Sequence, residues 1–73
     1  MSNTIIDKKA IKEIGAEFFK LRREKSLFIY QVAKKTAMPE KVIEGIELGR
    51  YIKYGKIRRL AKFYDKKIYI TLE

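Results

Sequence analysis

Apolar residues recur at three- and four-residue spacing through most of this chain, as they do in helices that bury one face. The first such segment runs from Lys8 to Lys25, and Asp7 is placed to cap it. Its apolar positions are Ile11, Ile14, Phe18 and Leu21. The same spacing predicts further helices over Tyr30–Thr36, Pro39–Leu48 and Tyr54–Tyr64. The hydrophobic pattern therefore predicts a mainly α fold.

Proline and glycine mark the two ends of the third predicted helix. Pro39 suits the first helical position, where the N–H that proline lacks is not needed. Gly49 suits a left-handed residue after the last turn, and the connection before Pro39 is expected at Ala37 and Met38. The residues expected to face inward from the last three helices are Val32, Ala33, Ile43, Ile46, Ile57, Leu60, Ala61 and Tyr64.

The hydrophobic period changes from 3.6 to 2 over residues 67–72, which predicts a half-buried strand. No other segment has the pattern of a strand that could pair with it, so the same strand of a second copy is the natural partner. We expect one domain over residues 1–73, with an N-terminal arm (1–7), a helical core (8–65) and a dimerisation strand (67–72). The strand residues expected to hold the homodimer are Ile68, Tyr69, Ile70 and Leu72.

The amino-acid composition excludes the side chains on which most enzyme mechanisms depend. The chain of 73 residues has no cysteine and no histidine, so it lacks a thiol nucleophile, an imidazole base and the usual zinc ligands. We therefore expect no enzyme activity, no metal and no cofactor. Apolar runs are far shorter than the roughly 20 residues that span a bilayer, and residues 1–10 lack the apolar segment of a signal peptide. These features predict a cytoplasmic protein without a membrane partner.

The net charge of +9 favours a polyanionic partner. Basic residues concentrate between residues 50 and 67, where eight of them accompany the single acid Asp65. Lys56, Arg59 and Lys62 are expected to point outward from the fourth helix. Charge alone does not identify the polyanion, and a basic surface that only maintains solubility is the alternative.

Three segments carry a resemblance to a known family. They are LRREKSL at residues 21–27, VAKKTAM at 32–38 and IEGIELG at 43–49. In this spacing they resemble the Cro/repressor (XRE) family of helix-turn-helix proteins, over about residues 18–65. The resemblance implies a four- to five-helix domain whose third helix reads DNA. It also implies a structural ion pair between Arg22 and Glu47, for which two solvated surface charges are the alternative.

Two positions depart from the family's pattern. Ile29 stands where the family commonly has a glutamine that contacts phosphate, and isoleucine can donate no hydrogen bond. Ala37 stands where the family has a glycine in the turn. That change is mild if Ala37 keeps a negative φ and strained otherwise.

The resemblance places four residues where family members read base edges, namely Glu40, Lys41, Glu44 and Gly45. A carboxylate can accept from cytosine N4, and Lys41 can donate to guanine O6 or N7. Two acids facing a polyanion lower the affinity, so the surrounding basic residues must compensate. The alternative is that Glu40 only complements the helix dipole and that Glu44 is solvated.

Phosphate contacts are expected mainly from the loop after this helix, at Arg50, Tyr51 and Lys53, where the family grips the DNA backbone. Weaker candidates are Lys34, Lys35 and Lys56. Such contacts position a protein on DNA without reading its sequence.

The C-terminal strand is similar to that of HipB-like antitoxins and of Cro proteins, which dimerise by pairing such strands. The expected fold is thus a mainly α, Cro/repressor-like helix-turn-helix domain whose short C-terminal β-strand pairs across a homodimer. The expected function is sequence-specific binding of a pseudo-palindromic operator in double-stranded DNA, as a transcription regulator of the repressor or antitoxin type. A cognate toxin is a further candidate partner. The alternative is a protein-interaction module or toxin-neutralising partner that uses the same fold with little specific DNA binding.

Overall fold

The computed structural model describes residues 8–50 and 53–66. These residues form four helices and no strand: α1 (Lys8–Glu24), α2 (Ile29–Thr36), α3 (Glu40–Glu47) and α4 (Tyr54–Phe63). The prediction of a mainly α fold is confirmed. The predicted arm (1–7), Tyr51 and the predicted strand (67–72) lie outside the described residues.

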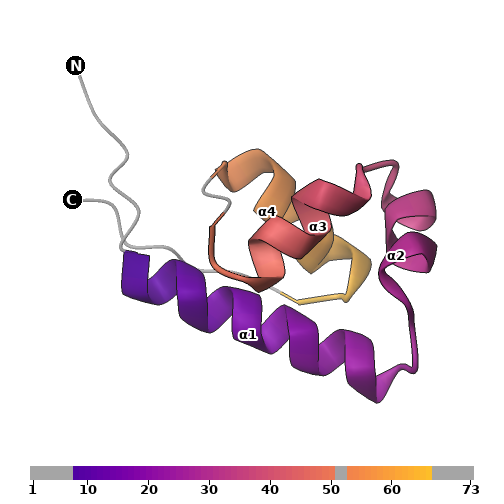
Figure 1. The fold of residues 1–73 in the computed structure, drawn as a ribbon, viewed down its shortest axis with the longest axis horizontal. Coiled ribbons are helices and arrows are strands. Elements are labelled where there is room, and N and C mark those ends of the chain that lie inside the picture. The colour runs from indigo at the N-terminus through magenta and orange to yellow at the C-terminus, as the bar shows by residue number, and fades with distance from the viewer. Residues whose placement is uncertain (1–7, 51–52, 67–73) are drawn as a thin grey trace.

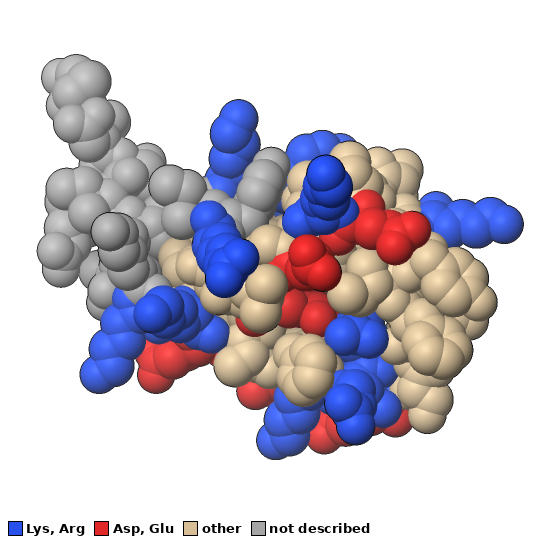
Figure 2. Space-filling model, in the orientation of Figure 1, with Lys and Arg blue, Asp and Glu red and all other residues tan. Residues whose placement is uncertain are grey.

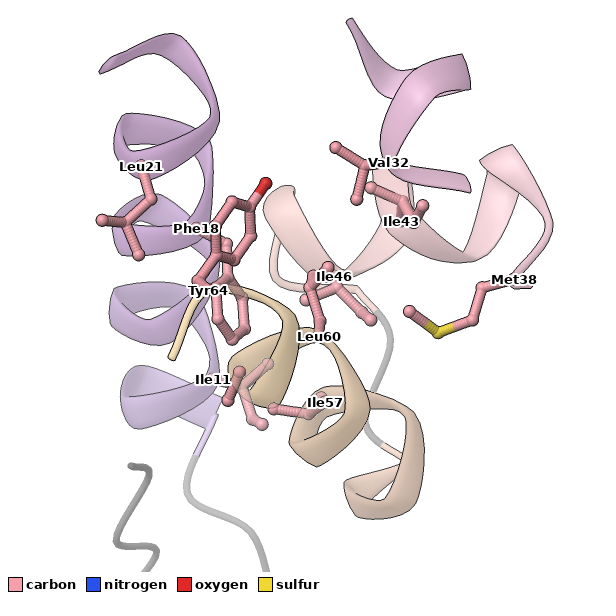
Figure 3. Close-up of a cluster of buried hydrophobic side chains, with 11 residues drawn as sticks. Ile11, Phe18, Leu21, Val32, Met38, Ile43, Ile46, Ile57, Leu60 and Tyr64 are labelled. Carbon is pink, nitrogen blue, oxygen red and sulfur yellow. The ribbon is translucent and has the colours of Figure 1, made fainter. Parts of the chain in front are cut away.

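The long helix α1 runs along one side of the molecule; α3 packs against it, and α2 packs against α3 and α4 (Figure 1). Their apolar faces meet in one core, which Figure 3 shows from close by. The buried apolar residues are Ile11, Phe18, Leu21, Val32, Met38, Ile43, Ile46, Ile57, Leu60, Ala61 and Tyr64. Ile14 and Ala33, both expected to face inward, are half-buried and pack against the edge of this core.

Each of the four helices is followed within two residues by a residue with positive φ, and only one of these residues is a glycine. They are Ser26 (φ 55°), Ala37 (φ 58°), Gly49 (φ 73°) and Asp65 (φ 56°). In each case the next N–H donates to the carbonyl oxygen five residues earlier, as Leu27 does to Arg22 at 3.0 Å. This reversal closes each helix. The prediction that Gly49 adopts the left-handed conformation is confirmed.

The helix boundaries differ from the predicted ones by one residue at several ends. α1 ends at Glu24, because Ser26 already turns the chain, and α2 begins at Ile29. The placement of Pro39 at the first helical position was wrong. Pro39 has ψ 147°, which is an extended conformation, and it is the N-cap that precedes the first helical residue of α3. Its carbonyl oxygen accepts a hydrogen bond from the Val42 N–H at 3.0 Å.

The ends of the last two helices also fall one residue earlier than predicted. Leu48 is the C-cap of α3, and Tyr64 is the C-cap of α4. Tyr64 nevertheless faces the core, where its ring stacks on Phe18 of α1 with centroids 5.8 Å apart. This contact fastens the end of α4 to the middle of α1.

Candidate nucleic-acid interface

The exposed side of α3 carries the residues expected to read bases. Glu40, Lys41 and Glu44 are exposed, and Gly45 is half-buried beside them. The opposite side of this eight-residue helix is fixed in the core by Ile43 and Ile46, which are buried completely or nearly so. Because Glu40 and Glu44 are four positions apart, their side chains lie on the same side of α3.

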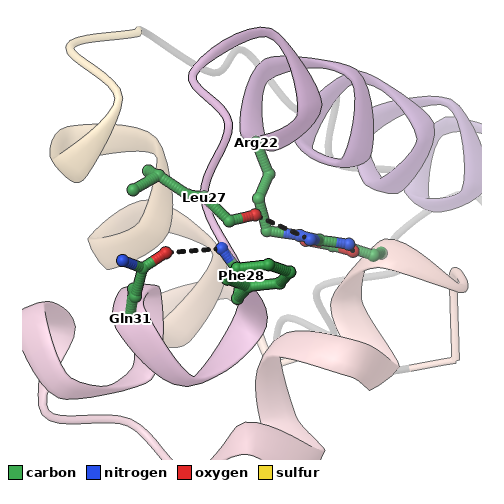
Figure 4. A network of polar contacts seen from close by, with 5 residues as sticks. Arg22, Leu27, Phe28 and Gln31 are labelled. Atoms are coloured by element: carbon green, nitrogen blue, oxygen red, sulfur yellow. Dashed lines mark hydrogen bonds and ion pairs between the residues drawn. The ribbon is translucent and has the colours of Figure 1, made fainter.

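An ion pair ties the last turn of α3 to α1. Arg22 Nε and Nη2 donate to the two carboxylate oxygens of Glu47 at 2.8 and 3.0 Å. The remaining nitrogen, Nη1, donates to the Leu27 carbonyl oxygen at 3.0 Å, as Figure 4 shows. The Arg22 and Glu47 side chains are only 11% and 5% exposed, so they do not form the solvated surface pair that was the alternative. The hydrogen bond with Glu47 raises the pKa of Arg22 above its ordinary value.

A glycine brings α1 against the same end of α3. A Cβ atom at Gly15 would overlap the carbonyl oxygen of Ile46 and lie 2.9 Å from that of Glu47. Close packing here depends on the missing side chain. Together with the Arg22–Glu47 pair, it fixes the position of α3 relative to α1.

The connection between α2 and α3 is tight and strained. Ala37 adopts φ 58° and ψ 37°, which is the left-handed conformation. Of the two possibilities for this residue, a negative φ and a strained positive φ, the structure therefore contains the strained one. Met38 follows it and is buried, and its N–H donates to the Ala33 carbonyl oxygen at 3.1 Å. The sequence pattern placed Met38 in a turn and missed this contribution to the core.

Basic side chains surround the acidic residues of α3. Figure 2 shows acidic side chains near the middle of this face, over α3, with lysine and arginine side chains around them. The phosphate candidates Lys34, Lys35, Arg50 and Lys53 are exposed. Arg50 comes after Leu48 and Gly49 at the end of α3, and its N–H donates to the Gly45 carbonyl oxygen at 2.8 Å. Lys53 is the N-cap of α4.

One phosphate candidate is less accessible than expected. Lys56, predicted to point outward from α4, is half-buried. Arg59 and Lys62 on the same helix are exposed as predicted. Basic groups therefore remain available on α2, after α3 and on α4.

Among the described residues, the two exposed acids of α3, Glu40 and Glu44, have no basic partner, unlike Glu47, which pairs with Arg22. Over residues 8–50 and 53–66, neither Glu40 nor Glu44 takes part in an ion pair. The face therefore combines hydrogen-bond acceptors at its centre with positively charged hydrogen-bond donors around it. Carboxylates can accept hydrogen bonds from amino groups, and the surrounding ammonium and guanidinium groups can neutralise phosphates.

Sequence reasoning missed one feature at the start of α2. Phe28 and Tyr30, at the start of α2, are 65% and 58% exposed. Their rings stack on each other, with centroids 5.9 Å apart and an angle of 11° between the planes. The signal in the sequence was two aromatic residues two positions apart, outside the apolar stripe of α2.

The described part of the chain meets neither the requirements of a metal site nor those of a membrane-spanning helix. It holds no group of three or more acidic, histidine or cysteine residues arranged to bind a metal ion. None of its helices combines the length and the apolar character that crossing a membrane requires. No family model matches the chain, and no curated protein or solved structure matches it significantly.

Proposed function

We propose that this protein is a sequence-specific DNA-binding transcription regulator of the helix-turn-helix type, resembling Cro/repressor proteins. The observation that carries the proposal is the presentation of α3. Its inner side is buried through Ile43 and Ile46, its end is tied to Arg22, and its outer side is exposed among basic residues. A short helix held in this way can enter a major groove without losing its position.

Charge supports the same proposal. The protein has a net charge of +9, and the exposed basic residues Arg50 and Lys53 follow α3 in the chain. Each phosphate that a lysine or arginine neutralises releases a counterion, which favours binding. These residues would hold the backbone while Lys41 and the acids of α3 meet base edges.

A homodimer completes the proposal. The pairing of residues 67–72 across two copies, expected from their alternating pattern, would place two copies of α3 on successive faces of a pseudo-palindromic operator. Deleting the residues after Asp65 should therefore give a monomer or an unfolded chain in sedimentation equilibrium. A truncated protein that stays a dimer would remove the strand from the proposal.

The experiment that tests the function is selection of a preferred sequence from a pool of random duplexes by the full chain. We expect an enriched pseudo-palindrome, and log affinity for any duplex should fall with log salt at a slope of about −0.9 per neutralised phosphate. Lys53→Ala should weaken binding to selected and random duplexes alike. Lys20→Ala, an exposed lysine on the opposite side of α1 from the core, is the matched control and should bind normally. Enrichment of no sequence, with affinity independent of salt, would exclude the proposal.

The two exposed acids on α3 favour one second candidate. Glu40 and Glu44 repel phosphates, and a protein with a basic surface would be attracted by them instead. In that case the fold would serve as a protein-interaction module or toxin-neutralising partner, with weak and unspecific DNA binding. The duplex selection separates the two functions. The composition, without histidine or cysteine, supports neither an enzyme nor a cofactor.

A further inference from the structure

Phe28 and Tyr30 form an exposed aromatic pair at the start of α2 that the DNA proposal does not use. Among the described large apolar side chains they are the two most exposed, at 65% and 58%. Exposing two neighbouring rings costs free energy, because water prefers not to hydrate apolar surface. Aromatic rings held in this way on a surface are the usual centres of protein–protein contacts.

The backbone under the pair is held in place from both sides. Before the pair, the carbonyl oxygen of Leu27 accepts from Arg22 Nη1 at 3.0 Å. Within it, the Phe28 N–H donates to Gln31 Oε1 at 2.7 Å, a bond visible in Figure 4. The Phe28 carbonyl oxygen then accepts from the Gln31 N–H at 3.1 Å. Little conformational freedom remains to be lost when a partner binds, which favours affinity.

Positive charge lies beside the pair. Lys34 is four positions after Tyr30 in α2, so both side chains lie on the same side of the helix, and both are exposed. Lys35 is exposed as well. In Figure 2 the side of the molecule over α2 is largely uncharged, with basic side chains next to it. The surface thus joins an apolar centre to ammonium groups.

We propose that Phe28, Tyr30 and Lys34 form a docking site for an acidic segment of another protein. An apolar side chain of that segment would pack on the rings, and its carboxylates would pair with Lys34. The site goes beyond the proposed DNA binding and does not depend on it.

Charge and ring geometry favour this occupant over others. In a symmetric contact of two copies through this site, Lys34 and Lys35 of one copy would face the same positive charges of the other. Duplex DNA offers phosphates to Lys34 but no free apolar surface to two rings. A single strand stacks its bases on open ring faces, and the mutual stacking of Phe28 and Tyr30 covers one face of each ring.

The test is an NMR titration of the full chain with a short synthetic peptide in which glutamate alternates with leucine and phenylalanine. Backbone amide shifts should change around Phe28, Tyr30 and Lys34. The double variant Phe28→Ala/Tyr30→Ala should lose about tenfold or more in affinity, and Lys34→Glu should lose affinity to a similar extent. These side chains are exposed, so the variants should keep the wild-type circular dichroism spectrum.

Matched controls exist on α1. Phe19 is also an exposed aromatic residue, 43% accessible, with the guanidinium of Arg23 5.6 Å from its ring centre. Phe19→Ala and Lys20→Glu should bind the peptide as the wild type does. The DNA affinity of the Phe28→Ala/Tyr30→Ala variant should also be unchanged, which separates this site from the duplex surface.

Three results would overturn the proposal. One is equal binding of a peptide with lysine in place of glutamate, and another is equal loss of affinity in the Phe19→Ala control. The third is preferential binding of oligo-dT or duplex DNA through Phe28 and Tyr30, which would assign the pair to nucleic acid. The first two results would leave the duplex selection unaffected, and the third is recognised by loss of DNA affinity in the Phe28→Ala/Tyr30→Ala variant, so failure of one proposal is distinguishable from failure of the other.

Discussion

Gly15 of α1 lies directly against the carbonyl oxygen of Ile46 in α3, with no room for a side chain between them. Glycine costs a helix interior about 0.5–1 kcal/mol relative to alanine, so this position is intrinsically unfavourable. The close approach that it permits brings the two helices together at the end where Arg22 also binds Glu47. Both contacts hold the helix that we propose enters DNA.

Gly15→Ala should therefore destabilise the protein, although alanine favours helices. The added methyl group meets backbone atoms that cannot rotate away, and we expect a loss of about 1–3 kcal/mol in urea denaturation. Gly55→Ala is the matched control, since a Cβ there would have no neighbour within 4 Å. It should keep or raise stability, by up to about 1 kcal/mol. Equal effects of the two substitutions would contradict the close approach.

Ala37→Gly should stabilise the turn between α2 and α3. Alanine at φ 58° pays about 1–2 kcal/mol for its left-handed conformation, and glycine does not. Part of this gain is offset because glycine is more flexible in the unfolded chain, so we expect about 0.5–1 kcal/mol. Ala37→Val should be destabilising, because a β-branched residue fits this conformation poorly. Thermal denaturation of both variants measures the difference, and a less stable glycine variant would contradict the left-handed assignment.

Arg22 and Glu47 should show strong coupling in a double-mutant cycle. Removing either partner leaves a poorly solvated charge, and we expect Arg22→Met or Glu47→Leu to cost about 3 kcal/mol. The double variant should cost clearly less than the sum of the two. Arg22→Lys should also destabilise, because lysine cannot bond both carboxylate oxygens and Leu27 in one geometry. Additive effects in guanidinium denaturation would show that the pair contributes little.

Tyr64 should make stability depend on pH in the alkaline range. Burial, with a smaller contribution from the Glu47 carboxylate, raises its pKa from 10.0 to about 12. The folded protein favours the neutral phenol, so this contribution is complete below the unfolded pKa of 10.0 and is lost as the pH rises toward 12. Above pH 10, Tyr64→Phe should therefore lose less stability than the wild type.

The same substitution has an expected effect at neutral pH. The Tyr64 hydroxyl is buried and has no hydrogen-bond partner among the described residues. Phenylalanine removes this unpaired group while keeping the ring that stacks on Phe18, so stability should stay equal or rise by about 1 kcal/mol. A large loss at neutral pH would show that the hydroxyl makes a stabilising bond.

The acids of α3 should oppose DNA binding unless they read bases. Glu40→Gln and Glu44→Gln remove negative charge from an exposed face and should raise affinity for all duplexes. Lys41→Ala should instead relax the preference at one position of each half-site, where a contact with guanine is worth about 1–3 kcal/mol. Binding to selected and random duplexes separates these cases. A glutamine variant that binds only the selected duplex more weakly would identify that glutamate as a base reader, and no effect from any of the three would favour the protein-interaction function.

The sequence by itself determined which segments are helices and which side of each one is buried. Helical periodicity is a local property, so Ile11, Phe18, Ile43 and Leu60 could be assigned to the core from spacing alone. Gly49 could be assigned a left-handed conformation for a similar reason, because glycine takes it without steric cost. The exposure of Glu40, Lys41 and Glu44 followed from the same spacing.

The tertiary structure decided what depends on distant segments. Nothing in the sequence around Gly15 distinguishes it from Gly55, where a side chain would meet no neighbour. Only the packing of α3 against Gly15 shows that a side chain has no room there. Ala37 adopts positive φ against its own preference, because helix α2 must turn within one residue for Met38 to reach the core. Arg22 is buried because three acceptor atoms, from Glu47 and Leu27, surround its guanidinium. Local preference sets where a helix forms, but contacts between segments decide which strained or charged residues the fold can accommodate.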